Sequence, residues 1–300
     1  MNSKQERVII FGGGGFVGEQ FIKSCSKLLE IISPSSKKLN ILNKTALKTF
    51  FKQQKGIKAV INFAAYTDIS SAEKERANKK GPCFRVNAEG ACNLASQTHD
   101  LGIFFIQIST DSIFPGTDNF PGPYLEKSKP KTSLNNLSWY GYTKLVAEQK
   151  IKKSNSKSAI VRISFPFGNP NSKKDYCLKV LTRIIQNKPL FSDQVLSPTY
   201  LNNLSLVLRK LIYLQQPGIY HVATTDLVTP YNFGKYLETK LGLNIKINRS
   251  TIAKITSNQY LKKGGLASKD TQYKLGLSFH SVKEAIDEFA DILKPAFLNK

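Results

Sequence analysis

Short apolar runs alternate with amphipathic segments along the first half of the chain. Apolar runs rich in β-branched residues predict buried strands over residues 7–13, 59–66 and 103–110. Between them, apolar side chains recur every three or four positions over 18–32 and 87–102, which predicts helices. A predicted helix over 138–154 and a predicted strand over 158–165 continue the series. This alternation indicates an α/β fold in which helices wrap a doubly wound parallel sheet.

The pattern becomes less regular after residue 168. Residues 169–300 have more loops, one short apolar run at 218–223 and two helix-like stretches. We therefore expect a first domain over 1–168 and a smaller α/β domain over 169–300. The strand at about 218–223 is expected to return to the main sheet.

Composition places the chain among ordinary globular proteins. It has 300 residues, of which 41% are hydrophobic and 22% charged, which is enough to bury a core. No apolar run approaches the roughly 18 residues that a membrane-spanning helix needs. The polar start, MNSKQER, lacks the apolar core and the cleavage site of a secretory signal. We therefore expect a cytoplasmic protein that does not enter the membrane.

Basic residues outnumber acidic residues by a wide margin. Lys and Arg number 44 against 21 Asp and Glu, a net charge of +23, and such a field attracts anions. The lysines are spread along the chain, without a basic tail or an arginine-rich arm. This distribution argues against specific nucleic-acid binding and favours a solvated basic surface that suits small anionic substrates.

Cysteine and histidine give no sign of a metal site. Neither residue type forms a CxxC pair or a cluster, so we expect neither a zinc site nor a disulfide framework. The scattered positions are Cys25, Cys83, Cys92, Cys177, His99, His221 and His280.

Four glycines stand between the first predicted strand and a predicted helix, in the stretch VIIFGGGGFVGEQF. A glycine turn at this place lets backbone N–H groups approach a pyrophosphate at the positive end of the helix. Two spacings fit, Gly13-x-Gly15-x-x-Gly18 and Gly12-x-x-Gly15-x-x-Gly18. A glycine loop alone is often structural, but its place on the first strand favours a Rossmann-type dinucleotide site.

Two further segments carry candidate chemistry. In WYGYTKLVAEQ, Tyr140 and Lys144 are four residues apart and share one helix face. A nearby ammonium group lowers the pKa of a phenol, which makes Tyr140 a candidate proton donor. In FIQISTDSIF, a predicted strand ends in Ser109, Thr110 and Asp111, where α/β proteins bind ligands. Each segment also has a structural explanation, namely a surface Tyr–Lys pair and a Ser/Thr turn.

Together these segments resemble the dTDP-4-dehydrorhamnose reductase family of extended short-chain dehydrogenases/reductases. The stretches AVINFAAYTDISSAE, VNAEGACNLA, ISTDSIFPG and YGYTKLVAEQ are similar to motifs of that family. FSDQVLSPTYLNNLS resembles the family's substrate loop, and GIYHVA also matches. The resemblance spans residues 7–225 and is loose beyond them.

The resemblance implies NADPH-dependent reduction of the 4-keto group of a nucleotide-linked 6-deoxysugar, from dTDP-4-dehydro-L-rhamnose to dTDP-L-rhamnose. It assigns NADP to the first domain and the nucleotide sugar to the second. Tyr140 would protonate the forming alkoxide, and Thr110 would hold the carbonyl oxygen. Lys144 would lower the pKa of Tyr140 and hydrogen-bond the nicotinamide ribose.

The resemblance also implies two sets of binding residues. The implied cofactor-binding residues are Gly12, Gly15, Phe16, Val17, Gly18, Ser33, Lys37, Lys38, Asn40, Ile41, Ala64, Ala65, Tyr66, Asn87 and Ser109. The implied substrate-binding residues are Asp111, Phe167, Asp193, Gln194, Ser197 and Thr199.

The stretch that corresponds to the end of the second strand in dinucleotide-binding folds bears on the choice of cofactor. The stretch IISPSSKKLNILN contains Ser33, Lys37 and Lys38 but no carboxylate. An acidic residue there would bind the ribose 2′-hydroxyl of NAD, whereas hydroxyl and ammonium groups suit a 2′-phosphate. We expect a preference for NADPH over NADH, with a solvated loop that touches no cofactor as the structural alternative.

Departures from the family pattern leave other functions open. Ser112, Pro115 and Leu196 replace a Tyr, an Asp and a Gly of the family motifs, and LKKGGLASKD replaces a late Lys-Arg-Pro segment. One alternative is a reductase or epimerase of another nucleotide sugar. The other is a non-catalytic, NADP-binding regulatory subunit like that of methionine adenosyltransferase. Retention of all three candidate catalytic residues argues for an enzyme, and a homodimer is one option for its assembly.

Overall fold

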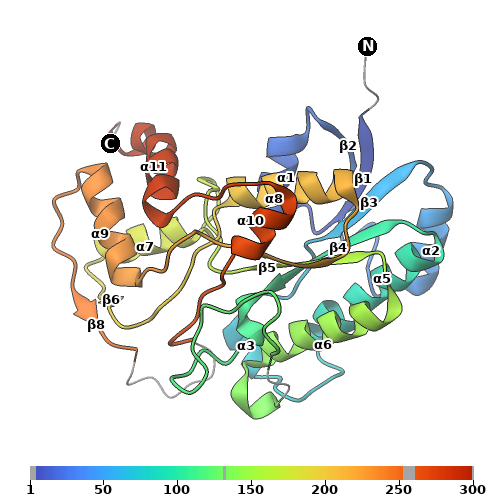
Figure 1. The fold of residues 1–300 in the computed structure, drawn as a ribbon, viewed down its shortest axis with the longest axis horizontal. Coiled ribbons are helices and arrows are strands. Elements are labelled where there is room, and N and C mark those ends of the chain that lie inside the picture. The colour runs from blue at the N-terminus through green and yellow to red at the C-terminus, as the bar shows by residue number, and fades with distance from the viewer. Residues whose placement is uncertain (1–4, 131–132, 253–260, 299–300) are drawn as a thin grey trace.

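The computed structural model describes residues 5–130, 133–252 and 261–298. A parallel sheet of six strands runs through the molecule, with helices on both faces (Figure 1). In spatial order the strands are β2 (Leu29–Ile32), β1 (Glu6–Phe11), β3 (Ile57–Asn62), β4 (Phe104–Thr110), β5 (Ser158–Ile163) and β7 (Gly218–Val222). Every neighbouring pair in this sheet is parallel. The predicted doubly wound α/β fold is confirmed.

The order of the strands reverses between β1 and β3, which lie side by side in the sheet. From β1 the chain passes outward to β2, and from β3 it passes the other way through β4 and β5 to β7. In open parallel sheets, ligands bind at the carboxyl ends of the strands beside such a reversal. The glycine turn after β1 and the segment after β3 therefore lie where a cofactor is expected.

Burial on both faces explains why the central strands are apolar. Every residue of β4 and β5 is buried, as parallel strands are when helices cover both faces of their sheet. One face packs against α1 (Phe16–Cys25) and α8 (Leu201–Leu214). The other face packs against α2 (Lys44–Lys52), α5 (Ala91–Asp100) and α6 (Trp139–Ser154) (Figure 1). Helix α6 therefore carries the predicted Tyr–Lys pair directly over the sheet.

Short helical segments connect these layers. They are α3 (Ile69–Glu73), α4 (Pro82–Phe84), the π-helical turn η1 (Arg85–Gly90), the 3-10 turns η2 (Asp111–Ile113) and η3 (Leu134–Asn136), and α10 (Lys269–Leu275). The turn η1 leads directly into α5, so the helix predicted from residue 87 is regular only from Ala91. Such π turns within helices are frequent at functional sites.

A second core lies in the C-terminal part of the chain. It is built on α7 (Tyr176–Ile185), α9 (Pro230–Leu241) and α11 (Val282–Leu298), and a small sheet of β6 (Leu190–Phe191) and β8 (Arg249–Ser250) lies beside it. Asp175 begins α7, because its carboxylate accepts a hydrogen bond from Leu178 N at 3.1 Å. Between α8 and α9 the chain returns to the main sheet and forms β7 beside β5.

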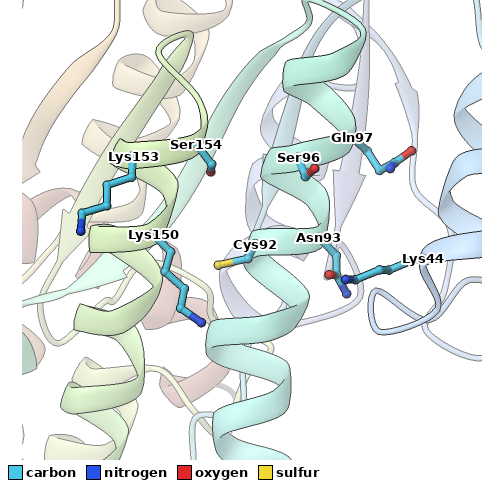
Figure 2. A pocket seen from close by; sticks show the side chains of 8 residues that line it. All are labelled: Lys44, Cys92, Asn93, Ser96, Gln97, Lys150, Lys153 and Ser154. Carbon is cyan, nitrogen blue, oxygen red and sulfur yellow. The ribbon is translucent and has the colours of Figure 1, made fainter.

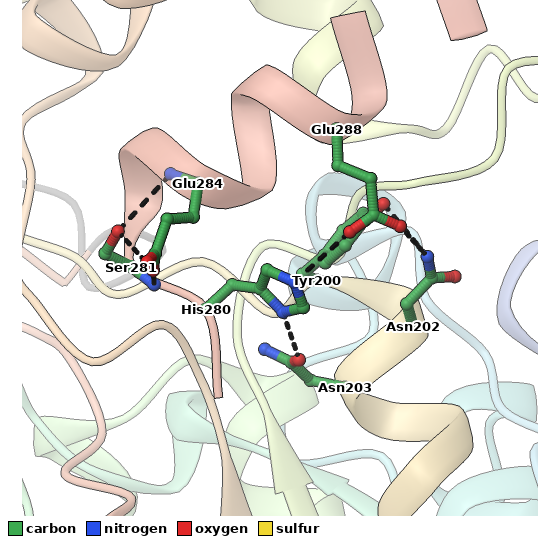
Figure 3. Close-up of polar contacts among 7 residues, drawn as sticks. All are labelled: Tyr200, Asn202, Asn203, His280, Ser281, Glu284 and Glu288. Carbon is green, nitrogen blue, oxygen red and sulfur yellow. Dashed lines mark hydrogen bonds and ion pairs between the residues drawn. The ribbon is translucent and has the colours of Figure 1, made fainter. Parts of the chain in front are cut away.

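Polar contacts tie the start of α11 to the start of α8 (Figure 3). His280 Nδ1 lies 2.8 Å from Asn203 Oδ1, and His280 Nε2 lies 3.2 Å from a Glu288 carboxylate oxygen. Asn202 Nδ2 donates to the other Glu288 oxygen at 2.6 Å and to the Tyr200 hydroxyl at 3.0 Å. These contacts hold the C-terminal helix against a helix that covers the main sheet.

The helix predicted over 18–32 is wrong at its C-terminal end. Helix α1 ends at Cys25, and Leu29–Ile32 form the edge strand β2, which pairs with β1. Apolar residues continue at helical spacing into the β-branched pair Ile31 and Ile32, so periodicity alone does not locate the boundary. Helices α2, α7, α8 and α10 are not among the elements that the sequence pattern predicts.

The described helices differ from helices that span a membrane. None of their helices combines the length and the apolar character that crossing a membrane requires. The first four residues of the polar start, from which no secretory signal is expected, lie outside the described residues.

Candidate active site

The glycine turn joins β1 to α1 and brings backbone segments into close contact. Gly12 has a φ of 77°, and a Cβ on it would lie 2.4 Å from Ala64 N. A Cβ on Gly18 would lie 2.5 Å from Gly12 O. Only glycine fits these two positions without movement of the backbone. Gly14 is different, because a Cβ on it would meet no atom within 4 Å.

The start of α1 faces the open side of this turn. Gly15 N donates to Gly12 O at 3.0 Å, which closes the turn, and Gly15 occupies the N-cap position of α1. Since Gly15 has no side chain, it leaves the first N–H groups of the helix uncapped, including those of Phe16 and Val17. An uncapped helix start beside the open space over Gly14 fits a pyrophosphate.

The loop after β2 lies against the glycine turn. Ser33 Oγ donates to Ile10 O at 3.1 Å, and a Cβ on Gly13 would collide with the Ser33 hydroxyl. Lys37 and Lys38 follow in an exposed turn. The predicted 2′-phosphate residues therefore belong to one loop, and Ser33 places that loop beside the turn expected to bind pyrophosphate.

Two residues predicted to bind the cofactor, Asn40 and Ile41, lie in the same loop. Ile41 is buried, and its side chain fills the space where a Cβ of Gly90 would lie. Ile41 O accepts from Asn93 Nδ2 at 3.0 Å, which fixes the loop on α5. Asn40 is exposed, and its Oδ1 accepts from Leu42 N at 2.9 Å. Asn40 is thus more accessible to a ligand than Ile41.

Two buried amides hold the segment after β3. Asn62 Oδ1 accepts from the N–H two residues later at 3.0 Å. Asn87 makes two hydrogen bonds with the backbone of Tyr66, of 2.8 and 3.1 Å, and donates to Thr143 Oγ1 at 3.0 Å. Because Asn87 is buried, it positions Tyr66 through its backbone and joins the segment to α6. Residues 64–66 themselves stay partly exposed, as a cofactor contact requires.

Thr110 and Tyr140 meet at the carboxyl end of β4. Thr110 is the last residue of the strand, and its hydroxyl caps η2 by accepting from Ser112 N at 3.1 Å. Tyr140 lies in the first turn of α6, which Ser138 caps by accepting from Gly141 N at 3.0 Å. The Thr110 hydroxyl is close enough to the Tyr140 phenol to lower its pKa. The structure therefore brings these two predicted catalytic side chains together.

Burial dominates the ionisation of Tyr140. Desolvation raises the pKa of its phenol, and the negative charges that Asp111 and Cys83 can carry raise it further. The expected lowering of this pKa by Lys144 is not seen, and the Lys144 ammonium donates to Ile108 O at 2.6 Å. Tyr140 therefore keeps its proton near neutral pH and is a proton donor.

Lys144 is a buried amine, only 3% exposed. Burial lowers its pKa to about 8, and the Glu148 carboxylate opposes this shift. The Ile108 carbonyl that accepts from Lys144 also accepts from Gln107 Nε2 at 2.7 Å. Lys144 is thus a donor beside Tyr140 on one face of α6, with an ammonium group that discharges slightly above neutral pH.

Asp111 is a buried carboxylate next to the Thr110–Tyr140 pair. It accepts from Ser164 Oγ at 2.6 Å and from Thr110 Oγ1 at 3.2 Å. Burial raises the pKa of Asp111 despite these hydrogen bonds. Its contacts make Asp111 a partner of Thr110 rather than an exposed ligand for a sugar.

Two predicted site residues lie in the core instead. Ser109, predicted to bind the cofactor, is buried and donates to Glu148 Oε1 at 2.6 Å. Phe167, predicted to bind substrate, is 0% exposed and packs against Tyr200 and Phe233. Packing explains both positions, and the structure brings neither side chain to the site.

The predicted substrate loop is held by the segment that begins at Leu261. Gln194 Nε2 donates to Leu261 O at 3.0 Å, and Ser197 Oγ accepts from Leu266 N at 2.7 Å. Both side chains are buried. They therefore shape the loop by joining it to a segment in which the resemblance of the motifs is loose.

The two ends of the loop are also fixed by protein contacts. Asp193 is partly exposed, and its Oδ1 accepts from Ile252 N at 2.7 Å. Thr199 is buried, donates to Val222 O at 2.5 Å and accepts from Ser164 N at 2.9 Å. Of the predicted substrate residues, Asp193 is thus the most accessible.

Sequence reasoning missed a buried charge pair behind the site. Arg162 on β5 and Glu148 on α6 form a two-pronged ion pair, with N–O distances of 3.0 and 2.7 Å. The signal that could have found it is one charged residue inside each of two largely apolar stretches, AIVRIS and LVAEQ. Charged residues at such positions are rarely buried unless they are paired.

Two surface hollows lie away from the predicted catalytic residues. One of about 400 Å³ lies between the outer sides of α5 and α6 (Figure 2), and its lining residues are Lys44, Cys92, Asn93, Ser96, Gln97, Lys150, Lys153 and Ser154. Another of about 750 Å³ lies beside α7 and includes Lys173, Lys179 and Arg183. Within the described ranges, no three His, Cys, Asp or Glu side chains gather to hold a metal ion. Neither hollow is lined by Thr110, Tyr140 or Lys144, so the candidate active site is assigned from these side chains and not from the volume of a hollow.

Comparison with known proteins gives four informative matches. A family model described as the RmlD substrate binding domain matches residues 6–293. The spore coat polysaccharide biosynthesis protein SpsK of Bacillus subtilis is 28% identical over 256 residues, which cover 85% of this chain and 84% of that protein. The methionine adenosyltransferase 2 subunit beta of Xenopus tropicalis is 30% identical over 209 residues, which cover 66% of this chain and 58% of that protein. The crystal structure of dTDP-4-dehydrorhamnose reductase from Bacillus anthracis in complex with NADP matches with a TM-score of 0.82 and 25% identity, covering 99% of this chain and 100% of that one.

Proposed function

Because the chain belongs to the RmlD substrate-binding domain family, we propose that it is an NADPH-dependent reductase of a nucleotide-linked 4-keto-6-deoxysugar. The favoured substrate is dTDP-4-dehydro-L-rhamnose, which would be reduced to dTDP-L-rhamnose. The observation that carries this proposal is the gathering of Thr110, Tyr140 and Lys144 at the carboxyl end of β4. The similar Bacillus anthracis protein is a dTDP-4-dehydrorhamnose reductase that binds NADP.

The proposed reduction needs a hydride and a proton. A bound nicotinamide supplies the hydride. Tyr140 supplies the proton to the oxygen at C4, since its raised pKa keeps the phenol protonated. The Thr110 hydroxyl, next to Tyr140, holds the same oxygen and stabilises the negative charge that develops on it. Lys144 provides an ammonium donor for the nicotinamide ribose.

The cofactor residues are proposed in two groups. Gly12, Gly15 and Gly18 form a turn whose close contacts and uncapped helix start suit a pyrophosphate. Lys37 and Lys38 are exposed in a loop with no carboxylate, which suits the 2′-phosphate of NADPH. We therefore propose NADPH as the preferred cofactor and NADH as a poorer one.

The direct test is to follow the absorbance of NADPH at 340 nm with dTDP-4-dehydro-L-rhamnose and to identify the product by NMR. We expect dTDP-L-rhamnose, with a kcat/KM at least roughly tenfold higher for NADPH than for NADH. Equal values for the two cofactors would contradict the proposed cofactor preference. Tight binding of NADPH without turnover of this sugar would contradict the proposed reaction.

A regulatory role is the second candidate, because methionine adenosyltransferase 2 subunit beta is among the similar proteins. In that role the chain would bind NADP and a synthetase subunit without reducing a sugar. Affinity purification from the native cell separates the two candidates. A stoichiometric synthetase partner together with no sugar turnover would favour the regulatory role.

We further propose that residues 1–168 bind the cofactor and residues 169–300 bind the nucleotide sugar. The core built on α7, α9 and α11 supports this division, although α8 and β7 of the second part pack with the main sheet. A cytoplasmic location and a homodimer stay predictions. Cell fractionation tests the location, and light scattering on the purified protein tests the assembly.

A further inference from the structure

A row of polar side chains crosses the sheet one position before Thr110. Ser109, Arg162 and His221 are register partners on β4, β5 and β7, and each is at most 2% exposed. Glu148 reaches the row from α6. Burying two charges in a sheet core costs desolvation energy, so a row of this kind calls for a role.

The four side chains form one hydrogen-bonded network. Arg162 Nε and Nη2 donate to the two Glu148 oxygens at 3.0 and 2.7 Å. Ser109 Oγ donates to the first of these oxygens at 2.6 Å. On the other side, Arg162 Nη1 lies 3.2 Å from His221 Nε2, and His221 Nδ1 lies 3.0 Å from Ala267 O. The network therefore runs from α6 across three strands to the segment after residue 261.

The hydrogen bonds fix the state of the histidine. Burial lowers the pKa of His221 to about 3, and the Arg162 charge contributes to this. The neutral ring must then accept from Arg162 at Nε2 and donate to Ala267 O from Nδ1. Each member of the row thus has one defined orientation.

The network touches each part of the proposed site. Ser109 precedes Thr110 on β4, and Glu148 follows Lys144 by one turn of α6. Ala267 belongs to the segment that holds the predicted substrate loop. The Ser109–Glu148 hydrogen bond therefore links the helix that carries Tyr140 and Lys144 to β4, the strand that ends in Thr110. The ion pair links the same helix to the neighbouring strand β5.

We propose that Glu148 and Arg162 are positioning residues for the reduction. Their buried ion pair, with the Ser109–Glu148 hydrogen bond, sets the rotation of α6 over β4 and β5 and so aims Tyr140 and Lys144 at the reacting groups. This inference rests on the function proposed above. Stability alone does not require the pair, because apolar side chains of similar volume often stabilise a core at least as well. The pair instead specifies one orientation of the helix.

The network also acts on Lys144 through charge. The ionisable groups that face Lys144 are Glu148 on its own helix and Cys83 from α4, and both raise its pKa against the effect of burial. Removal of the Glu148 charge would therefore let Lys144 lose its proton at lower pH. The pH profile therefore reports whether the Glu148 charge acts on Lys144, and separate changes in kcat and KM report whether the pair positions α6.

The test compares the double variant Glu148→Leu/Arg162→Met with the single variant Glu148→Gln and with the wild type. The double variant removes both charges together, so we expect it to fold, as thermal unfolding will check. We expect its kcat to fall by roughly 10- to 100-fold with little change in KM for the sugar, because misplaced catalytic groups lower the rate rather than ground-state binding. In both variants the alkaline limb of the kcat–pH profile should move to lower pH.

The control Leu208→Ala alters a buried residue on the opposite face of the sheet and should leave the alkaline limb of the profile at its wild-type pH.

Calorimetric titration of NADPH across a range of pH separates this inference from the proposed reaction, since it needs no sugar. As the pH is raised, NADPH affinity should weaken in both proteins because Lys144 loses its proton. We expect this weakening to begin at a lower pH in the double variant than in the wild type. If the wild type reduces no sugar, the proposed reaction fails while calorimetry still decides the role of the pair. A folded double variant with wild-type kcat and wild-type pH dependence of NADPH affinity would overturn the inference.

Discussion

Lys144 is the residue at which stability and proposed function oppose each other most clearly. Burial lowers its pKa from 10.5 to about 8, which means that the folded protein holds the ammonium less well than the unfolded chain does. The difference corresponds to about 3 kcal/mol of destabilisation wherever the amine is charged in both states. Ile108 O, the acceptor of Lys144, is also satisfied by Gln107, so no carbonyl would be left alone if the amine were removed.

Replacement of Lys144 by Met should therefore stabilise the fold while abolishing activity. At pH 7 we expect the free energy of unfolding to rise by up to about 3 kcal/mol. The gain should shrink as the pH rises from about 8 to about 10.5, because over this range the folded wild type has released the proton that its unfolded chain still binds. Urea unfolding at several pH values measures it. No gain at pH 7, or a gain that grows with pH, would contradict the buried charged state of Lys144.

The glycine turn gives a matched pair of substitutions. Gly12→Ala should cost about 2 kcal/mol or more, since Gly12 has a positive φ and no room for a Cβ. Gly14→Ala should change the free energy of unfolding by less than about 1 kcal/mol, because nothing lies near its missing Cβ. The Gly14→Ala variant should bind NADPH more weakly than the wild type, since its methyl group would enter the space proposed for the pyrophosphate. Equal stability losses in the two variants would count against this account of the turn.

Local backbone geometry decides which site residues could be identified from the sequence. Tyr140 and Lys144 are four residues apart on a helix, so their shared face follows from helical geometry alone. Ser109 and Thr110 are adjacent on a strand and point to opposite faces, and the sequence does not reveal which face carries the site. Phe167 could not be assigned either, because an aromatic residue after a strand serves a core and a ligand site equally well.

At the level of elements, the start of α6 decides where Tyr140 lies. Ser138 caps the helix two residues before Tyr140, and Trp139 N donates to the Glu73 carboxylate at 2.5 Å. Arg76 donates to two backbone carbonyls, Leu134 O and Leu137 O, in the loop that leads into the helix. The entry to α6 is therefore held by side chains of a different part of the chain, although the sequence around Tyr140 alone suggests only a helix.

Loss of this cap should affect stability and catalysis together. Ser138→Ala should lower the free energy of unfolding by about 1 kcal/mol and should also lower kcat, because the first turn of α6 carries Tyr140. Thr229→Ala is the matched control, since Thr229 caps α9 in the same way, with Asn232 N at 3.1 Å. It should cost a similar free energy and leave kcat unchanged. The same kcat loss in both variants would show that the cap at α6 has no special role.

The sequence predicted best those elements whose hydrophobic pattern fits only one type of secondary structure. The strands around residues 59–66 and 103–110 are short apolar runs, and they became β3 and β4. The end of α1 was missed because its apolar spacing continues into an edge strand after a three-residue turn. Helix α8 was missed because it is apolar over much of its length, which hides a helical period.

For the molecule as a whole, the net charge of +23 favours association with anions. The proposed substrate and cofactor both carry phosphate groups. We expect kcat/KM for the sugar nucleotide to fall roughly 2- to 10-fold when salt is raised to shorten the screening length, with kcat unchanged. Steady-state kinetics over a series of NaCl concentrations measures this. An unchanged kcat/KM would show that the basic surface does not steer substrate.

The most direct measurement compares the wild type with Tyr140→Phe in the oxidation of NADPH by dTDP-4-dehydro-L-rhamnose. The account predicts that the variant binds NADPH with wild-type affinity, keeps its thermal stability and loses roughly 10²- to 10⁴-fold in kcat, because only the proton donor is removed. A Tyr140→Phe variant that turns over sugar at the wild-type rate would contradict the account.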